Sequence, residues 1–127
     1  EHMMATRLWQ NTAKVHFDAT MRPDGQRLIY GGHVISMARA LSFNGLANAQ
    51  MIAAINAGAH ANPCFSGSTL RAWSEVLDHA ATSNPSIGAL RLRLVATTGA
   101  AGELKGDDGK YLPQVLLDLD YWALMPR

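Results

Sequence analysis

The strongest constraint in this sequence is a pair of glycines directly before an apolar run. Gly31 and Gly32 precede residues 33–44, in which polar side chains recur at every third position. The polar members of the run are Ser36, Arg39 and Ser42. This spacing predicts a helix whose other sides are covered by apolar neighbours, and Gly45 predicts its end. The first amides of a helix lack internal partners and glycine allows close approach, so this helix start is a candidate site for a carbonyl or phosphate oxygen.

After Gly45 the apolar residues alternate, which is typical of strands rather than helices. Four strands are expected, the first with a bulge or bend because Ile52 and Ile55 break its alternation. They span residues 51–59, 69–78, 89–97 and 114–125. Without a second long helix for parallel crossovers, the strands are expected in meander order, in an antiparallel sheet wrapped around one long buried helix. This α+β arrangement is the hotdog fold, here truncated at the N-terminus because its usual first strand is missing.

The last two strands carry charges of opposite sign on one face. Arg91 and Arg93 alternate with leucines in one strand, and Asp118 and Asp120 alternate with apolar residues in the other. In an antiparallel pair these side chains are expected to face one another, fixing the register more than the stability. The connection at residues 98–113 holds four glycines and several charges. With so little to bury, it is expected to be the least ordered internal segment.

Length and composition indicate a single soluble domain. The 127 residues suffice for one core, and we interpret residues 1–3 as a cloning remnant and residues 4–127 as one domain. The net charge of +1 comes without a block of like charge, so nucleic acid is not expected as a partner. No apolar run is long enough for a membrane span. The single Cys64 has no partner for a disulfide, which favours a reducing, cytoplasmic compartment.

Four segments, taken in order, resemble a known family. They read N-T-A-K-V-H-F-D from residue 11, Y-G-G-H-V-I-S-M-A-R-A-L-S-F-N-G-L-A-N-A from residue 30, N-P-C-F-S-G-S-T-L-R-A-W-S-E-V-L-D from residue 62, and L-D-L-D-Y-W-A-L-M-P-R at the end. From Leu8 onward the chain closely resembles the C-terminal half of MaoC-like hotdog dehydratases of the (R)-specific enoyl-CoA hydratase group, in the branch that hydrates mesaconyl-CoA. Those enzymes are longer and contain two hotdog halves.

The resemblance implies a set of catalytic residues. The family pattern Asp-x-Asn-Pro-x-His places its histidine on His16 and its aspartate on Asn11, where no carboxylate is present. His16 is then the base that activates water, Asn11 can orient that water, and Asp18 can share the proton transfer. The plainer interpretations are that His16 is a hydrogen-bonded structural histidine and that Asn11 only caps a turn.

The resemblance also implies a substrate-binding group at the helix start. The family's glycine that donates its amide to the thioester oxygen falls on Gly32, with Gly31 and His33 on either side. A tight turn into a helix also needs glycine without a ligand, and His33 is interpreted mainly as a packed residue. His60 and His79 lack the spacing of a zinc site, so no metal is expected.

These observations lead to one expected function and two alternatives. The expected function is reversible addition of water to a short branched enoyl-CoA such as mesaconyl-CoA, with the CoA thioester as substrate and no cofactor. The alternatives are a non-catalytic half that binds acyl-CoA or completes a partner's fold, and a hotdog thioesterase in which Asp18 activates water. The missing strand leaves an exposed sheet edge, so a homodimer or higher homo-oligomer is expected.

Overall fold

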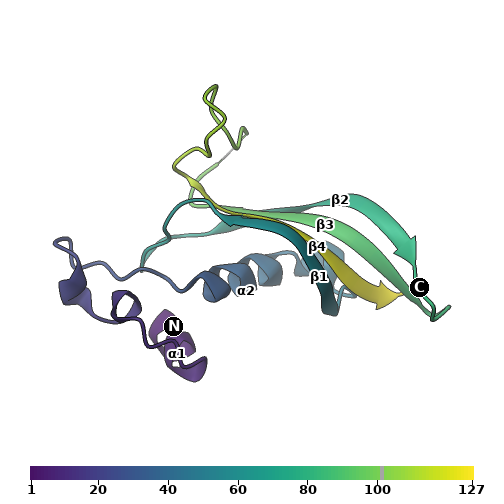
Figure 1. The fold of residues 1–127 in the computed structure, drawn as a ribbon, viewed down its shortest axis with the longest axis horizontal. Coiled ribbons are helices and arrows are strands. Elements are labelled where there is room, and N and C mark those ends of the chain that lie inside the picture. The colour runs from purple at the N-terminus through teal and green to yellow at the C-terminus, as the bar shows by residue number, and fades with distance from the viewer. Residues whose placement is uncertain (101) are drawn as a thin grey trace.

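A computed structural model describes residues 1–100 and 102–127 of the chain. A four-stranded antiparallel sheet curves over one face of helix α2, Gly31–Leu41 (Figure 1). The strands are β1 Met51–His60, β2 Arg71–Ala81, β3 Ile87–Thr97 and β4 Val115–Pro126. The shorter helical elements are α1 His2–Leu8, the 3-10 turns Lys14–His16 and Ala19–Met21, and α3 Phe43–Leu46. The predicted α+β class, the central helix and all four strands are confirmed.

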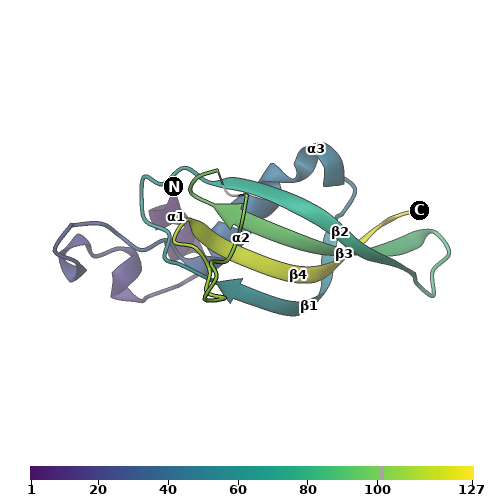
Figure 2. The ribbon, with the colours of Figure 1, turned by 90° about the horizontal axis from the view of Figure 1, so that it is seen from above.

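The strand order differs from the expected meander. Strands β2, β3 and β4 are antiparallel neighbours in sequence, but β1 lies beside β4, which gives the order β1-β4-β3-β2 (Figure 2). The physical reason is that β4 is the most deeply buried strand and therefore has a neighbouring strand on both sides. Alternation of apolar residues shows which face of a strand is buried, but it does not show which strand pairs with it. The predicted irregularity in β1 is confirmed by register shifts between Ile52 and Ala54 and between Ile55 and Ala57.

Helix α2 is shorter and less covered than the sequence predicts. It ends at Leu41, because the Ser42 hydroxyl donates to the Arg39 carbonyl at 2.6 Å and a new short helix starts after it. Val34 and Ala38 are buried against the sheet, but Leu41 is 52% exposed. The sheet therefore covers one face of α2, and the prediction that the helix is wrapped on most sides is wrong for this chain by itself.

The core lies between α2 and the two central strands. Its largest members come from alternate positions of β3 and β4, as their sequence pattern predicts. The fully buried ones facing α2 include Leu92, Leu94, Leu117 and Tyr121. Within the part of the chain that the structure describes, no helix is both long and apolar enough to cross a membrane.

The opposite face of β3 and β4 carries the predicted charge pairs. Arg93 contacts Asp118 at 2.7 Å and Arg91 contacts Asp120 at 2.6 Å, each through two hydrogen bonds. The pairs are diagonal, because Arg93 stands opposite Asp120 in the ladder. Asn56 of β1 also donates to Asp120, at 2.9 Å, so the network joins three strands. It ties the register of β3 and β4 to that of the edge strand β1.

The connection between β3 and β4 is a closed hairpin over the residues that the structure describes, and Ala101 lies outside them. Lys105 pairs with Tyr111, and the Tyr111 hydroxyl donates to Asp118 at 3.0 Å. The backbone amide of Leu112 also bonds the Leu104 carbonyl at 2.9 Å. Slow amide exchange across residues 102–110 would contradict the expectation that this connection is poorly ordered. At Leu112 the hydrogen bond to Leu104 predicts that amide exchange is slowed.

The charge network predicts a pH dependence of stability. Hydrogen bonds from Arg91, and then from Asn56, lower the pKa of the Asp120 carboxyl to about 2, from its ordinary value of 3.8. A carboxylate with a lowered pKa in the fold stabilises it above the unfolded pKa, and this stabilisation is lost as the pH falls toward the folded pKa. Asp120→Asn should therefore flatten the pH dependence of the unfolding free energy between about pH 4 and pH 2.

The measurement is denaturant unfolding at a series of pH values. Asp107→Asn is the matched control, because Asp107 is an exposed carboxylate in the connection between β3 and β4. The control should keep the wild-type pH dependence. Equal slopes in the wild type and in Asp120→Asn would show that the network does not stabilise the fold.

Exposed apolar side chains on the two edge strands predict self-association. Ile55 on β1 is 58% exposed and Val76 on β2 is 59% exposed. We expect the chain to form at least a dimer at micromolar concentration, measured by light scattering, because large apolar groups and a free sheet edge are usually covered. Ile55→Glu and Val76→Glu place the same charge on opposite edges, and the variant that dissociates the assembly identifies the edge in use. A monomeric wild type would contradict the expectation.

Candidate functional site

His16 is held in a defined orientation by the backbone of a neighbouring segment. It is the last residue of the 3-10 turn Lys14–His16. Its Nδ1 lies 2.8 Å from the carbonyl oxygen of Leu28. A carbonyl can only accept, so Nδ1 carries the hydrogen and Nε2 of the neutral ring keeps its lone pair. The ring also packs edge-on against Tyr30, with centroids 6.1 Å apart.

A cavity of about 280 Å³ opens beside this histidine. Helix α2 contributes Gly31 and Val34, which are three residues apart and share a helix face. The connection from β1 to β2, residues 61–70, crosses near the start of α2, where the Ile29 amide donates to the Cys64 carbonyl at 2.7 Å. The full lining is His16, Leu28, Ile29, Gly31, Val34, His60, Asn62, Pro63, Cys64 and Leu116.

His60 brings a second imidazole to the same cavity. It is the last residue of β1, and its ring packs against the first residue of α2. A Cβ on Gly31 would stand 2.9 Å from both Cε1 and Nε2 of His60. A larger residue at position 31 would push the His60 ring aside, which is a steric reason for Gly31 apart from any ligand.

The start of α2 leaves backbone donors free. Tyr30 is the N-cap residue, and its carbonyl accepts from the amides of His33 and Val34. Within the described residues, the amides of Gly31 and Gly32 have no hydrogen-bond acceptor. Such amides, together with the helix dipole, attract a partly negative oxygen. Gly31 lines the cavity, so this electropositive helix end lies at its wall.

Asn62 adds a fixed polar group to the wall. Its Nδ2 donates both hydrogens, to the carbonyls of Leu112 at 2.9 Å and Val115 at 2.8 Å. The amide is therefore locked at the start of β4, and its Oδ1 remains as an acceptor for a water or a ligand hydroxyl. Asn62, and not Asn11, is therefore the side-chain amide on the wall of the His16 cavity.

Two predicted catalytic residues lie outside this cavity. Asn11 accepts from the Ala13 amide at 3.2 Å in a local turn, and it lines a different cavity, next to Arg7 and Thr12. Asp18 caps the turn Ala19–Met21, and hydrogen bonds from Thr20 lower the pKa of its carboxyl. An aspartate with a lowered pKa is a weaker base, so the structure favours neither residue as the partner of His16.

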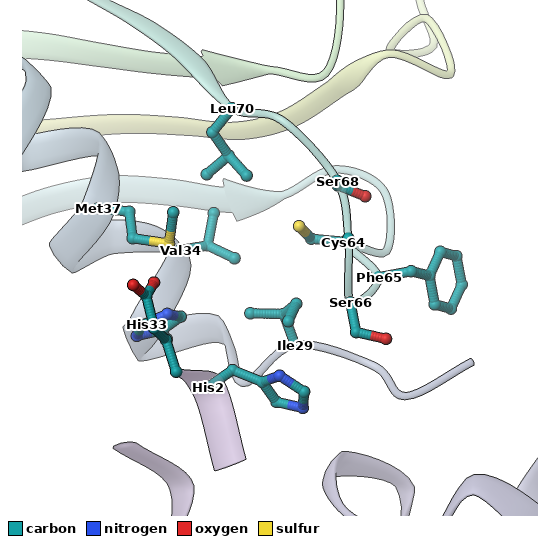
Figure 3. Close-up of a pocket in the computed structure, with 12 residues that line it drawn as sticks. His2, Ile29, His33, Val34, Met37, Cys64, Phe65, Ser66, Ser68 and Leu70 are labelled. Atoms are coloured by element: carbon teal, nitrogen blue, oxygen red, sulfur yellow. The ribbon is translucent and has the colours of Figure 1, made fainter. Parts of the chain in front are cut away.

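His33 lines a second cavity, of about 330 Å³, which shares Ile29, Val34 and Cys64 with the first (Figure 3). The crossing segment supplies Ser66 and Ser68 to its wall. Burial raises the pKa of the Cys64 thiol, which keeps it protonated near neutral pH. The structure thus brings His16 and Gly31 together, and it places His33 elsewhere.

His60 and Asn62 are functional candidates that sequence reasoning missed. His60 was considered only as a metal ligand, and the described residues contain no group of three or more potential ligands close enough for a metal. Strand alternation gives no signal for the pair, because His60 ends β1 and Asn62 lies in the bend after it.

Comparisons with known proteins show what the chain is similar to. No protein-family model matches the chain. It is 76% identical over 129 residues to a mesaconyl-CoA hydratase of Cereibacter sphaeroides, and 54% identical over 134 residues to a beta-methylmalyl-CoA dehydratase of Chloroflexus aurantiacus. The chain is homologous to MaoC-like dehydratases. Both alignments cover all of this chain but only 38% of the relative, so the chain spans well under half the length of these curated relatives.

A solved structure confirms the fold. The crystal structure of a protein from Chloroflexus aurantiacus described as a MaoC domain dehydratase matches with a TM-score of 0.90 and 53% identity. The match covers 99% of this chain and 38% of that one. The antiparallel sheet around α2 is therefore the hotdog fold of this MaoC-like group, as the sequence predicts.

The packing at the start of α2 predicts a specific response to substitution at Gly32. A Cβ on Gly32 would lie 2.6 Å from the Tyr30 ring, so Gly32→Ala should lower the unfolding free energy by about 1 to 3 kcal/mol through overpacking. Gly45→Ala is the matched control, because a Cβ there meets nothing within 4 Å. It should be neutral or slightly stabilising.

Thermal and denaturant unfolding of both variants measure the difference. Tyr30→Ala combined with Gly32→Ala should recover part of the loss, since the clashing ring is gone. Equal stability of Gly32→Ala and Gly45→Ala would show that the Tyr30 ring moves aside freely.

Proposed function

We propose that this chain is an acyl-CoA hydratase or dehydratase module, which reversibly adds water to a short branched enoyl-CoA such as mesaconyl-CoA. One observation carries the proposal: His16, whose Nδ1 is held by the Leu28 carbonyl, lines the same cavity as Gly31, whose amide at the helix start has no acceptor among the described residues. These are the base and the oxyanion donors that hydration of a thioester-conjugated double bond needs. The names of the two relatives support the same chemistry.

The proposed reaction begins with the thioester oxygen at the start of α2. The amides of Gly31 and Gly32 donate hydrogen bonds to this oxygen as negative charge develops on it during the attack of water on the β-carbon. His16 Nε2 takes a proton from that water, and the double-bond electrons move toward the carbonyl. Loss of one oxyanion donor typically costs about 3 to 4 kcal/mol of transition-state stabilisation. The enolate then takes a proton at the α-carbon, which completes the addition without any change of oxidation state and therefore without a cofactor.

The cavity favours a small acyl group. Its volume of about 280 Å³ is at the lower end of ligand sites, so the CoA portion must lie outside it. Among the described residues that line it, none is a carboxylate. A hotdog thioesterase would need such a base for attack on the carbonyl, so the wall favours hydration over thioester hydrolysis.

Replacing His16 tests the proposal directly. His16→Ala should lower the hydration rate by about a hundredfold to ten-thousandfold, because general acid-base catalysis by one positioned group is of that size. His79→Ala is the matched control, since His79 is an exposed histidine on β2. The rate is measured by enoyl absorbance and by release of free thiol in the same reaction, for the chain in its assembled state.

Each outcome of this assay selects one function. Thiol release would indicate a thioesterase, and a folded, assembled wild type that binds acyl-CoA without turnover would indicate the binding half. A hydratase in which His16→Ala retains the wild-type rate would remove His16 from the mechanism.

Asn11→Asp tests the role that the family pattern gives to residue 11. Aspartate keeps the acceptor that holds the Ala13 amide, so the turn should persist. Since Asn11 lies outside the His16 cavity, the hydration rate should stay within about threefold of the wild type. A large rise with a simple enoyl-CoA would instead show that residue 11 reaches the reacting water.

A further inference from the structure

We propose that His60 is a second catalytic residue of this site, which donates the proton that the α-carbon receives when water adds to the β-carbon. The inference rests on the proposed function and names a group that the family pattern does not supply. It is carried by the placement of His60 and His16, from segments far apart in the chain, on the wall of one cavity.

Hydration requires two proton transfers. One proton leaves the water that attacks the β-carbon, and one proton is added to the α-carbon. His16 can accept the proton of water at Nε2, but its Nδ1 is fixed on the Leu28 carbonyl, so the ring cannot turn to present a second nitrogen. Among the described lining residues, the remaining proton carriers are Cys64 and His60. Burial raises the pKa of the Cys64 thiol and makes it a weak donor. An imidazolium at His60 is the donor that can work near neutral pH.

The position of the His60 ring fits the α-carbon. Its Nε2 edge packs on Gly31, at the helix end where the thioester oxygen is proposed to bind. The α-carbon is bonded directly to the thioester carbonyl, whereas the β-carbon is one bond further away. A donor that touches the helix start is therefore placed for the α-carbon, and His16 is left for the water at the β-carbon.

The step balances without another reactant. A C–O bond forms between water and the β-carbon as the O–H bond to the proton taken by His16 breaks. The π electrons pass to the thioester oxygen and return to form the new C–H bond with the proton from His60. The cycle ends with His16 charged and His60 neutral. His60 is exposed to solvent, so bulk water can return a proton to it and take one from His16.

The surroundings of His60 contain few competing charges. Across the ladder it pairs with Leu117, and the next pair, Ala59 with Asp118, brings a carboxylate that is already bound to Arg93. Helix α2 faces it with Gly31, and His16 and Cys64 are the titratable groups that share its cavity.

The test is the kinetics of His60→Ala in the assembled chain, with and without added imidazole. We expect the maximal hydration rate to fall about a hundredfold or more at little change in KM, and imidazole to restore at least about a tenth of it. Rescue by free imidazole separates a proton donor from a structural residue, because a packing defect does not respond to a buffer molecule. His79→Ala with imidazole is the matched control and should show neither loss nor rescue.

The other results overturn the inference in distinct ways. A wild type that hydrates enoyl-CoA together with a His60→Ala variant of unchanged rate removes His60 and leaves the proposed function intact. A loss without rescue, or a loss confined to KM for substrates with a second carboxylate, assigns His60 to packing or to carboxylate recognition. An inactive wild type overturns the proposed function, and this inference with it.

Discussion

The packing of α2 against the concave face of the sheet is the contact on which the site depends. Val34 and Ala38 fix the helix on β3 and β4, and this holds its first turn where β1 ends and the crossing segment begins. The crossing segment must run from β1 at one edge of the sheet to β2 at the other edge, because β4 and β3 lie between these two strands. Helix start, strand end and crossing segment therefore meet, and the cavity is the space that they enclose.

Glycine at position 31 makes this meeting possible. The His60 ring occupies the place that a Cβ at residue 31 would take, so the helix start and the strand end are in direct contact. A free helix end and an imidazole in contact form a local region where negative charge is favoured. The charge that hydration places on a thioester oxygen is of this kind, which connects the backbone geometry to the proposed chemistry.

The sequence predicted those features of the fold that a single segment determines. Alternation along β3 and β4 identified their buried faces, and the charges on Arg91, Arg93, Asp118 and Asp120 identified their partnership. It did not predict the place of β1, because edge and neighbour are decided by the whole sheet. The exposure of the C-terminal end of α2 could not be predicted either, because the periodicity of a helix shows its apolar sides but not which elements cover them.

The site was predicted in the same partial way. His16 and the helix start came from the family pattern and from Gly31 and Gly32, and the structure places His16 and Gly31 on one wall. Asn11 was chosen because the family's aspartate position falls on it, and Asp18 because it is the carboxylate near His16 in sequence. In the structure each is held in its own local turn, outside the His16 cavity. His60 and Asn62 are distant in sequence, and only the return of β1 to the start of α2 brings them near.

The segment that carries His16, residues 11–18, is attached to the rest of the molecule by few hydrogen bonds. Besides the bond from His16 Nδ1 to the Leu28 carbonyl, the Leu28 amide donates to the Val15 carbonyl at 3.1 Å and Arg27 Nε donates to the Phe17 carbonyl at 2.9 Å. His2 Nε2 donates to the His16 carbonyl at 3.1 Å. A segment with so few attachments can open at a free energy far below that of global unfolding. The base would then be in place for only part of the time, and apparent substrate affinity would fall in proportion to the closed fraction. Whatever packs against this segment, whether substrate or a neighbouring subunit, would set the working rate of the site by holding it closed.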